Sequence, residues 1–426
     1  MELLLRASEV AAGVYAWDDA VAHLRAALDV LERADGPLAE RARVAERLGD
    51  RVYRAGVDFE EGIGRLEGAL ADYLAVGDVQ GAARVHSRLG MHLTTYPTTL
   101  DVPAALAHYQ AAEAVLAPGP ARRSLGYLYV GMAMAAVFGL QTGRLEVASR
   151  QALELAEHLG DGRLASWADY QRAWWAFNRG RLAESLSLHE RVRDTAVRLD
   201  DVRMGAWAAF GRALLSGTYL ADPRTAEAWC AWALALPRVE AFPRQRDNLL
   251  DQLGQAKGST GELADARRIA EGLDLGTVLE RMLLYWSGDW EQAEATWAAA
   301  KGRDERAGDR LDAALNAYWL GRVRRLLGAT EAAEAAFTES LMVTLEGPQV
   351  PAEAMPRAEL AMLDTENGRL EAGTPRQAGA TWSAPSALTP ESSTEASSSR
   401  PPSWAAPCQC GSGSVTTAPP PSATDL

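Results

Sequence analysis

Cysteine, lysine and long hydrophobic runs are all scarce in this 426-residue chain. Its three cysteines, Cys230, Cys408 and Cys410, are too few for the disulfide framework of a small secreted protein. No apolar run reaches the roughly 18 residues that a membrane-spanning helix needs. The opening MELLLRASEV places Glu2 and Arg6 around its leucines, unlike a secretory signal. These absences predict a cytoplasmic protein with no membrane partner.

Basic residues are in the minority, because 43 arginines and lysines face 57 aspartates and glutamates and give a net charge of −14. Only Lys257 and Lys301 are lysines, so nearly all the positive charge is on arginine. A chain this acidic repels a nucleic-acid backbone unless its arginines gather on one face. We therefore expect no direct binding of nucleic acid.

The motifs of common catalytic and metal sites are also missing. The stretch GQAKGST at 254–260 lacks the spacing of a phosphate-binding loop. The CQCG at 408–411 lacks a second ligand pair, and the six histidines form no zinc motif with a carboxylate. Acidic pairs at 18–19 and 200–201 suit helix starts, where capping and the helix dipole favour carboxylates. We expect neither an enzyme nor a bound metal or cofactor.

What the sequence does contain is a recurring phrase, such as GRLEVA at 143–148, GRLAES at 180–185, GELADA at 261–266 and GRLEAG at 368–373. The last residue of each copy is taken as an anchor, and the anchors are small: Ala20, Gly62, Ala105, Ala148, Ser185, Ala226, Ala266, Ala293, Ala333 and Gly373. Successive anchors recur roughly every 40 residues, a period that predicts stacked helical pairs. The interval from Ala266 to Ala293 is clearly shorter than the others, which predicts one pair with shortened helices.

The residues around each anchor indicate two helices that cross at a small side chain. Apolar or small residues recur four, seven and eight positions after the anchor, which is one face of a helix. A Leu-Gly pair upstream of the anchor, as at 253–254 and 320–321, lets the partner helix approach closely. Glycines five positions before the anchor are expected to close the preceding helix in the left-handed conformation, namely Gly143, Gly180, Gly261, Gly288 and Gly328. No stretch alternates like a strand, so the prediction is all-α.

This arrangement, with W/Y-L-G, then G-x-x-x-x-A, then an aromatic residue or Leu at +4 and Ala at +7, resembles the tetratricopeptide repeat. The usual period of that repeat is about 34 residues. The longer units here are similar to those of MalT-like and LuxR-type bacterial regulators and of ATPase/cyclase-associated regulators. The segments 31–53 and 84–116 carry this likeness most clearly. The resemblance implies a right-handed α-α superhelix over residues 3–373, with nine helix pairs and the first helix of a tenth.

The repeat stops abruptly, so we divide the chain into a solenoid at 1–375 and a disordered tail rich in Ser, Thr, Pro and Ala at 376–426. Residues 357–368 read as a first helix, yet no second helix follows. A natural tail and a reading frame shifted near codon 372 both fit this ending. The shift would leave a fragment of a larger regulator, and translating the coding DNA in the other two frames distinguishes the two origins.

The resemblance also implies candidate partner-binding residues, because the first helix of each tetratricopeptide pair lines the concave surface. Its second, fifth, ninth, twelfth and thirteenth positions face a partner. Counting back from three anchors gives Trp167, Tyr170, Trp174, Phe177 and Asn178; then Asn248, Asp251 and Gln255; then Tyr318, Arg322 and Arg325. The alternative for the aromatics is that they fill gaps between helix pairs.

The resulting functional expectation is a non-catalytic interaction scaffold that lacks the ATPase and DNA-binding parts of the regulators it resembles. Its partner would be a protein or peptide segment, or a small effector, held in the concave groove. The competing expectation is an all-helical enzyme with its site in the same groove, which would need converging titratable groups with shifted pKa values.

Overall fold

The computed structural model describes all residues except 57, 96–97, 121, 274–276, 348–349 and 368–426. It divides the chain into two units, Met1–Glu366 and Asn367–Leu426. The predictions for the tail, for the anchor Gly373 and for the helix after it lie outside the described residues. Every helix among the described residues belongs to the first unit.

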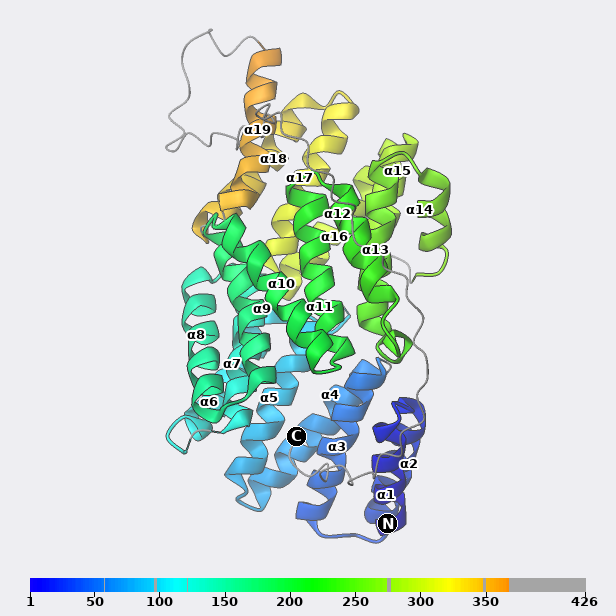
Figure 1. Ribbon diagram of the computed structural model, residues 1–426, viewed down its shortest axis with the longest axis vertical. Helices are drawn as coiled ribbons and strands as arrows, with labels where there is room; N and C mark the ends of the chain where they lie inside the picture. Colours follow the sequence, from blue (N-terminus) through cyan, green and yellow to red (C-terminus); the bar gives the residue numbers. More distant parts are fainter. Residues whose placement is uncertain (57, 96–97, 121, 274–276, 348–349, 368–426) are drawn as a thin grey trace, which may run out of the picture. The chain divides into compact units, whose positions relative to one another are not determined.

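The described residues contain nineteen α-helices and no strand (Figure 1). The first helices of nine pairs are α1 (Glu2–Gly13), α3 (Leu38–Ala55), α5 (Val79–Thr95), α7 (Arg123–Phe138), α9 (Gly162–Asn178), α11 (Val202–Leu214), α13 (Pro243–Ser259), α15 (Val278–Ser287) and α17 (Arg310–Leu326). Their second helices are α2 (Trp17–Arg33), α4 (Phe59–Ala75), α6 (Val102–Leu116), α8 (Thr142–Leu159), α10 (Leu182–Arg198), α12 (Pro223–Leu234), α14 (Leu263–Ala270), α16 (Trp290–Ala307) and α18 (Thr330–Glu346). Helix α19 (Val350–Glu366) begins a tenth pair. A π-helical turn, η1 (Leu215–Tyr219), extends α11, and a 3-10 turn, η2 (Val239–Ala241), precedes α13. The predicted all-α repeat of nine pairs and one further helix is confirmed.

The anchors are the points at which the two helices of each pair meet. All nine anchors within the described residues are buried, and each lies on a second helix. In the second, third and ninth pairs, the residue four positions after the anchor packs onto a glycine of the first helix. A Cβ on Gly49 would lie 2.5 Å from Leu66, and one on Gly321 would lie 2.6 Å from Phe337. The Leu-Gly pair at 320–321 is therefore where the partner helix comes closest, as predicted. For the pair at 253–254 the prediction is wrong, because a Cβ on Gly254 would lie 2.2 Å from Leu279 of α15, the first helix of the next pair, and not against α14.

The turns between paired helices follow the predicted glycines in four of five cases. Gly180, Gly261, Gly288 and Gly328 all have positive φ angles, between 72° and 92°. The prediction for Gly143 is wrong, since this glycine lies inside α8. There Leu140 takes the left-handed conformation, with φ at 54°, because α8 begins earlier relative to its anchor than the other second helices do.

The short interval after Ala266 comes from shortened helices, as predicted, but these belong to two neighbouring pairs and not to one. Helix α14 has only eight residues and α15 only ten, against 17 or 18 in neighbouring helices such as α13 and α16. No helix among the described residues is long and apolar enough to cross a membrane.

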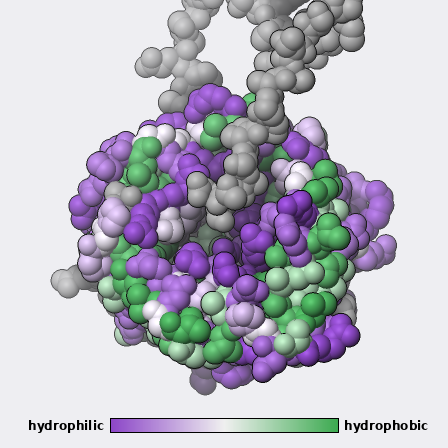
Figure 2. Space-filling model, turned by 90° about the horizontal axis from the view of Figure 1, so that it is seen from below, coloured by the Kyte–Doolittle hydropathy of each residue, from purple (hydrophilic) through white to green (hydrophobic). Residues whose placement is uncertain are grey.

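First helices form the inner layer of the superhelix and second helices form the outer layer. Consecutive first helices pack against one another, as in α5–α7, α7–α9, α11–α13 and α13–α15. Consecutive second helices make no comparable contact within the described part of the chain. Curvature of this kind places the first helices on the concave side. The view from below shows hydrophilic residues around a central hollow (Figure 2).

The superhelix is tightly coiled, because helices about five pairs apart in the sequence lie against each other. Helix α7 contacts α17, and α9 contacts α19. Nearer the N-terminus, the Trp17 indole Nε1 donates a hydrogen bond to the Ala241 carbonyl at 2.8 Å, and Tyr15 packs edge-on against Phe242. Successive turns of the superhelix therefore touch.

Replacing Gly321 with alanine should destabilise the ninth pair by about 1–3 kcal/mol, since the new Cβ overpacks against the fully buried Phe337 ring. Hydrogen exchange should quicken in α17 and α18. The control is Gly64→Ala, at an exposed site where a Cβ meets nothing within 4 Å. That change should stabilise α4 by about 0.5–1 kcal/mol through helix propensity alone. Equal effects of the two substitutions would contradict the close-approach role of Gly321.

Candidate binding face

The two layers of the superhelix differ sharply in charge. The first helices of the nine complete pairs contain 21 arginines and lysines against 10 aspartates and glutamates. The second helices of the same pairs contain 14 against 25. The net charge of −14 therefore conceals a basic inner layer and an acidic outer layer. The expectation of no nucleic-acid partner rested on net charge, and that argument does not apply to the inner layer.

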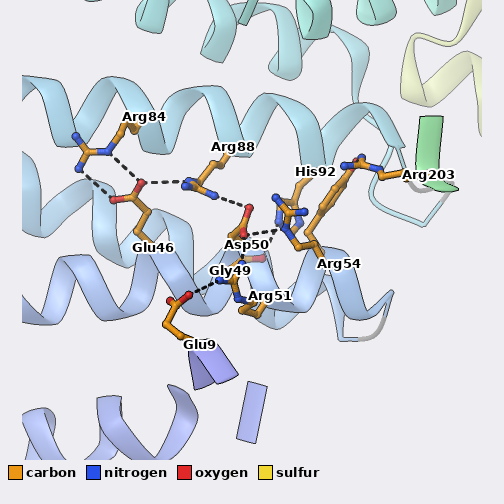
Figure 3. A network of polar contacts seen from close by, with 11 residues as sticks. Glu9, Glu46, Gly49, Asp50, Arg51, Arg54, Arg84, Arg88, His92 and Arg203 are labelled. Atoms are coloured by element: carbon orange, nitrogen blue, oxygen red, sulfur yellow. Dashed lines mark hydrogen bonds and ion pairs between the residues drawn. The ribbon is translucent and has the colours of Figure 1, made fainter. Parts of the chain in front are cut away.

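The largest group of inner arginines surrounds two buried carboxylates on α3 (Figure 3). Asp50 accepts from Arg88 Nη1 at 2.5 Å, Arg51 Nη1 at 2.8 Å and Arg54 Nε at 3.0 Å. Its neighbour one helical turn away, Glu46, is held in a similar way. The same helix thus supplies both acceptors and two of their donors.

Glu46 joins the network to α4 and α5. Arg84 Nε and Arg88 Nε donate to its Oε1 at 3.2 and 3.1 Å, and the Tyr73 hydroxyl donates to its Oε2 at 2.8 Å. On the other side, Arg51 reaches Glu9 of α1 at 3.4 Å. The network therefore ties the first three helix pairs together along the inner layer.

A contact from the next superhelical turn completes this region. Arg203 of α11 donates to the Tyr53 hydroxyl at 3.0 Å and lies over the rings of Tyr53 and Trp167. Figure 3 shows Arg51, Arg54, Arg84, Arg88 and Arg203 beside Glu9, Glu46 and Asp50. The network therefore carries excess positive charge.

Electrostatics fix the protonation states at the centre of this network. Burial alone would raise the pKa of Asp50, but the charges of Arg54, Arg88 and Arg51 outweigh it and hold the pKa well below its usual range. The side chains of Arg84, Arg54 and Arg88 remain 41%, 32% and 22% exposed. Their guanidinium groups are thus ordered by buried anions yet still partly accessible to a partner.

The five predicted residues of α9 lie inside the core rather than on an open groove. Trp167, Tyr170, Trp174, Phe177 and Asn178 are all at most 9% exposed. Tyr170 packs edge-on against both tryptophans and against His189, and it also contacts Trp207 of the next pair. The alternative for these aromatics, filling the gaps between helix pairs, describes this geometry, and a binding role for them stays a prediction.

This packing changes what an alanine substitution at these positions measures. Truncating a buried Trp174 or Tyr170 removes core contacts and should cost about 3–5 kcal/mol. Loss of partner capture in such a variant would not separate binding from folding. The arginines described above are better positions for a binding test.

The predicted residues of α13 and α17 are polar contacts between neighbouring pairs. Asp251 accepts from the Leu279 backbone N–H at 2.8 Å, near the start of α15, and from Gln255 at 2.7 Å, while Asn248 is half-buried on the same helix. In α17, the Arg322 and Arg325 guanidiniums both bind Glu359 of α19, and Arg322 also lies over the buried Tyr318 ring. Within the described residues, the structure does not bring these two groups and the α9 aromatics into one site.

Carboxylates gather at the junction of α16 and α17. Burial, followed by the charge of Asp304, raises the pKa of Asp312 to about 6, and burial raises the pKa of Asp309 as well. Asp309 accepts from the Asp312 backbone N–H at 2.9 Å as the cap of α17, and Asp304 accepts from Asn316 at 2.6 Å. These bonds give Asp309 and Asp304 structural roles at the start of α17 and between α16 and α17.

Sequence reasoning missed the arginine network, although a signal for it was present. The anchors assign each residue to a first or second helix, and counting charge separately for the two sets reveals the segregation. The pairing of Glu46 and Asp50 with α5 carried no such signal, because it depends on how adjacent pairs are rotated.

Comparisons with known proteins give a fold and no family. No protein-family model and no curated protein matches the sequence. Among solved structures, a Rap protein complexed with Competence and Sporulation Factor is similar over 86% of this chain and 98% of that chain, at 14% identity and a TM-score of 0.50. A monomeric mutant of IFIT1 with m7Gppp-AAAA matches over 79% and 80%, at 13% identity and a TM-score of 0.39, too low to carry an argument. The likeness concerns the fold alone, and that fold is a TPR-like helical repeat.

Proposed function

We propose that this chain is a cytoplasmic, non-catalytic binding scaffold whose basic inner face holds an extended acidic polypeptide segment. The observation that carries the proposal is the separation of charge between the inner and outer layers. Such a distribution attracts a negatively charged partner to the concave side and repels it from the convex side. Arginine suits this role better than lysine, because its planar fork binds carboxylates through two parallel hydrogen bonds.

The arginine network on α3 and α5 supplies the chemistry of recognition. Its guanidiniums already bind carboxylates of this chain, and their partial exposure leaves donors for a partner's Asp and Glu side chains. A single-stranded nucleic acid would also be attracted, but its binding usually needs exposed aromatic rings for base stacking. The aromatics that contact the network, Tyr53, Tyr73 and Trp167, are buried. This favours an acidic polypeptide over RNA.

The biological setting in this proposal is the sensor arm of a bacterial signalling or transcriptional regulator. Binding in the concave face would bias the curvature of the array, and curvature is the property that a connected domain could read. The superhelix has the inter-turn contacts for such a response, since α7 meets α17 and α9 meets α19.

The test is fluorescence anisotropy with a labelled oligo-glutamate peptide, an oligo-lysine peptide and a single-stranded RNA. The glutamate peptide should bind, with an affinity that falls as salt rises. The variant R54Q/R84Q should weaken it roughly tenfold, because two partly exposed guanidiniums are lost. Glu46 and Asp50 keep other partners in this variant, so the fold should persist.

The matched control is R33Q/R65Q, which removes two exposed arginines from the outer helices α2 and α4. It should leave the affinity for the glutamate peptide unchanged. Equal weakening by both double variants would show that the inner face is not the site. Tighter binding of the RNA than of the acidic peptide would replace the proposed partner class.

A further inference from the structure

A pocket of about 690 Å³ lies where two superhelical turns meet. Its walls come from the start of α6, from the α7–α8 turn and the start of α8, and from residues around the start of α17 and the end of α18. The regions from α6, α7 and α8 belong to one superhelical turn, and those from α17 and α18 belong to the next. The pocket is thus built from segments that lie far apart in the sequence.

Glycines bring these segments together and leave the space open. A Cβ on Gly308 would lie 2.6 Å from Pro103, so the two turns approach closely at this point. Gly139 and Gly143 also line the pocket without side chains. Val102 and Leu106 add an apolar wall beside them.

Two arginines at this pocket have no carboxylate partner among the described residues. Arg144 and Arg179 both line it, and neither makes an ion pair with any residue that the structure describes. A third, Arg310, is paired with Glu346. By contrast, the arginines of the network on α3 and α5, Arg51, Arg54, Arg84 and Arg88, all form ion pairs. Unpaired guanidiniums facing a shared cavity indicate a missing anion.

The start of α8 adds donors to the same wall. Gln141 precedes the helix without a side-chain cap, so the positive end of an 18-residue helix is open at the pocket. Thr142, the first residue of the helix, also lines the pocket and is 7% exposed, and its Oγ1 has no hydrogen-bond partner among the described residues. A buried hydroxyl without a partner is costly, and a bound oxyanion would supply the missing acceptor.

We propose that this pocket binds a small phosphate-bearing molecule between the two turns. Arg144, Arg179 and the start of α8 would hold the phosphate, while Val102 and Leu106 would cover an apolar portion. Glu146 and Glu346 also line the pocket, and they bind the Trp175 indole and Arg310, respectively. Gly308 and Arg310 line the pocket from the other turn, so a bound ligand also lies against that turn and its binding stabilises the coiled form. This site is independent of the acidic partner proposed for the inner face.

The experiment is calorimetric titration of the full chain with phenyl phosphate, and with benzyl alcohol as the uncharged comparison. Phenyl phosphate should bind saturably and raise the melting temperature, and benzyl alcohol should do neither. The variant R144Q/R179Q should weaken phenyl phosphate binding at least about tenfold, through loss of charged hydrogen bonds. Because neither arginine is ion-paired within the described residues, the melting temperature of the free variant should match that of the parent.

Arg150→Gln is the control, since Arg150 lies further along α8 with a 61% exposed side chain paired to Glu154. It should bind phenyl phosphate like the parent protein. Absence of saturable phenyl phosphate binding by the parent would overturn the proposal. So would an affinity that is unchanged in R144Q/R179Q.

Discussion

Replacing Asp50 with asparagine should lower the free energy of unfolding by about 3–5 kcal/mol, the range found when one partner of a buried ion pair is removed. The amide has the shape of the carboxylate but cannot balance Arg51, Arg54 and Arg88, which all contact Asp50 within 3.0 Å. Three guanidiniums would then repel one another in a site that is only 7% exposed. Urea unfolding followed by circular dichroism measures the loss, and hydrogen exchange should locate it in α3 and α5.

The matched control is Asp29→Asn on α2. Asp29 pairs with Arg33 one helical turn away, and both side chains are more than half exposed, at 58% and 71%. Solvent screens such a pair, so its loss should change stability by no more than about 0.5 kcal/mol. If Asp50→Asn lowered the free energy of unfolding by no more than the control does, the arginines would have to be solvated by water or neutralised by other carboxylates. The network would then not fix the first three pairs.

Acidification should destabilise the fold through two fully buried histidines. Burial lowers the pKa of both His92 and His189 to about 4, from about 6.5 in an unfolded chain. The folded state therefore binds fewer protons than the unfolded state below pH 6.5, and stability falls as the pH drops towards 4. Each histidine should cost on the order of 2 kcal/mol at pH 5 and 3 kcal/mol at pH 4.

The packing of both rings explains why neither histidine can take up a proton in place. His92 Nε2 lies 3.1 Å from the Gly49 carbonyl, and its Nδ1 has no hydrogen-bond partner among the described residues. His189 Nδ1 lies 2.9 Å from the Ser185 carbonyl, and its Nε2 is similarly unpaired within the described part of the chain. Protonation would place an unsatisfied cation in the core of the repeat.

The measurement compares the parent with a His92→Gln, His189→Gln double variant across pH. The quantity compared is the unfolding free energy of the parent minus that of the double variant. This difference should fall by on the order of 4 kcal/mol between pH 7.5 and pH 5, because glutamine does not titrate. Other titrating groups, including the carboxyls of Asp304 and Asp312, are common to both proteins and cancel in this difference. Exposed His158 provides the control, and His158→Gln should leave the unfolding free energy close to that of the parent, because this side chain lies outside the core. A flat difference for the double variant would mean that buried histidines do not set the acid limit.

Much of the fold could be predicted because each repeat contains the residues that its own helix crossing requires. A small anchor such as Ala333, an apolar residue such as Phe337 four positions later and a facing glycine at 321 are needed wherever two helices cross closely. That local requirement repeats along the chain, so it was visible without any knowledge of tertiary structure. The same reasoning located the shortened helices after Ala266.

The candidate site could be predicted only in part, because the sequence of a single repeat does not determine how tightly the superhelix coils. Counting positions placed Trp167, Tyr170 and Trp174 on the concave side, as the first helix of an open array would display them. Here adjacent first helices pack together, and Arg203 of the neighbouring first helix α11 lies over Trp167. Small rotations between pairs add up along the array, and no local pattern reports their sum.

Contact between successive turns has a consequence for how any partner reaches the inner face. Where α7 meets α17 and α9 meets α19, the lateral gap between turns is closed, so the face behaves more like the bore of a tube than like an open trough. A flexible segment with a free end can enter such a channel end first. A loop whose two ends are fixed in a folded domain can enter only after the contacts between successive turns separate. Entry and release would then be governed by uncoiling as well as by charge. An added residue at the partner's free terminus would affect the rate of capture even if it touched nothing once bound.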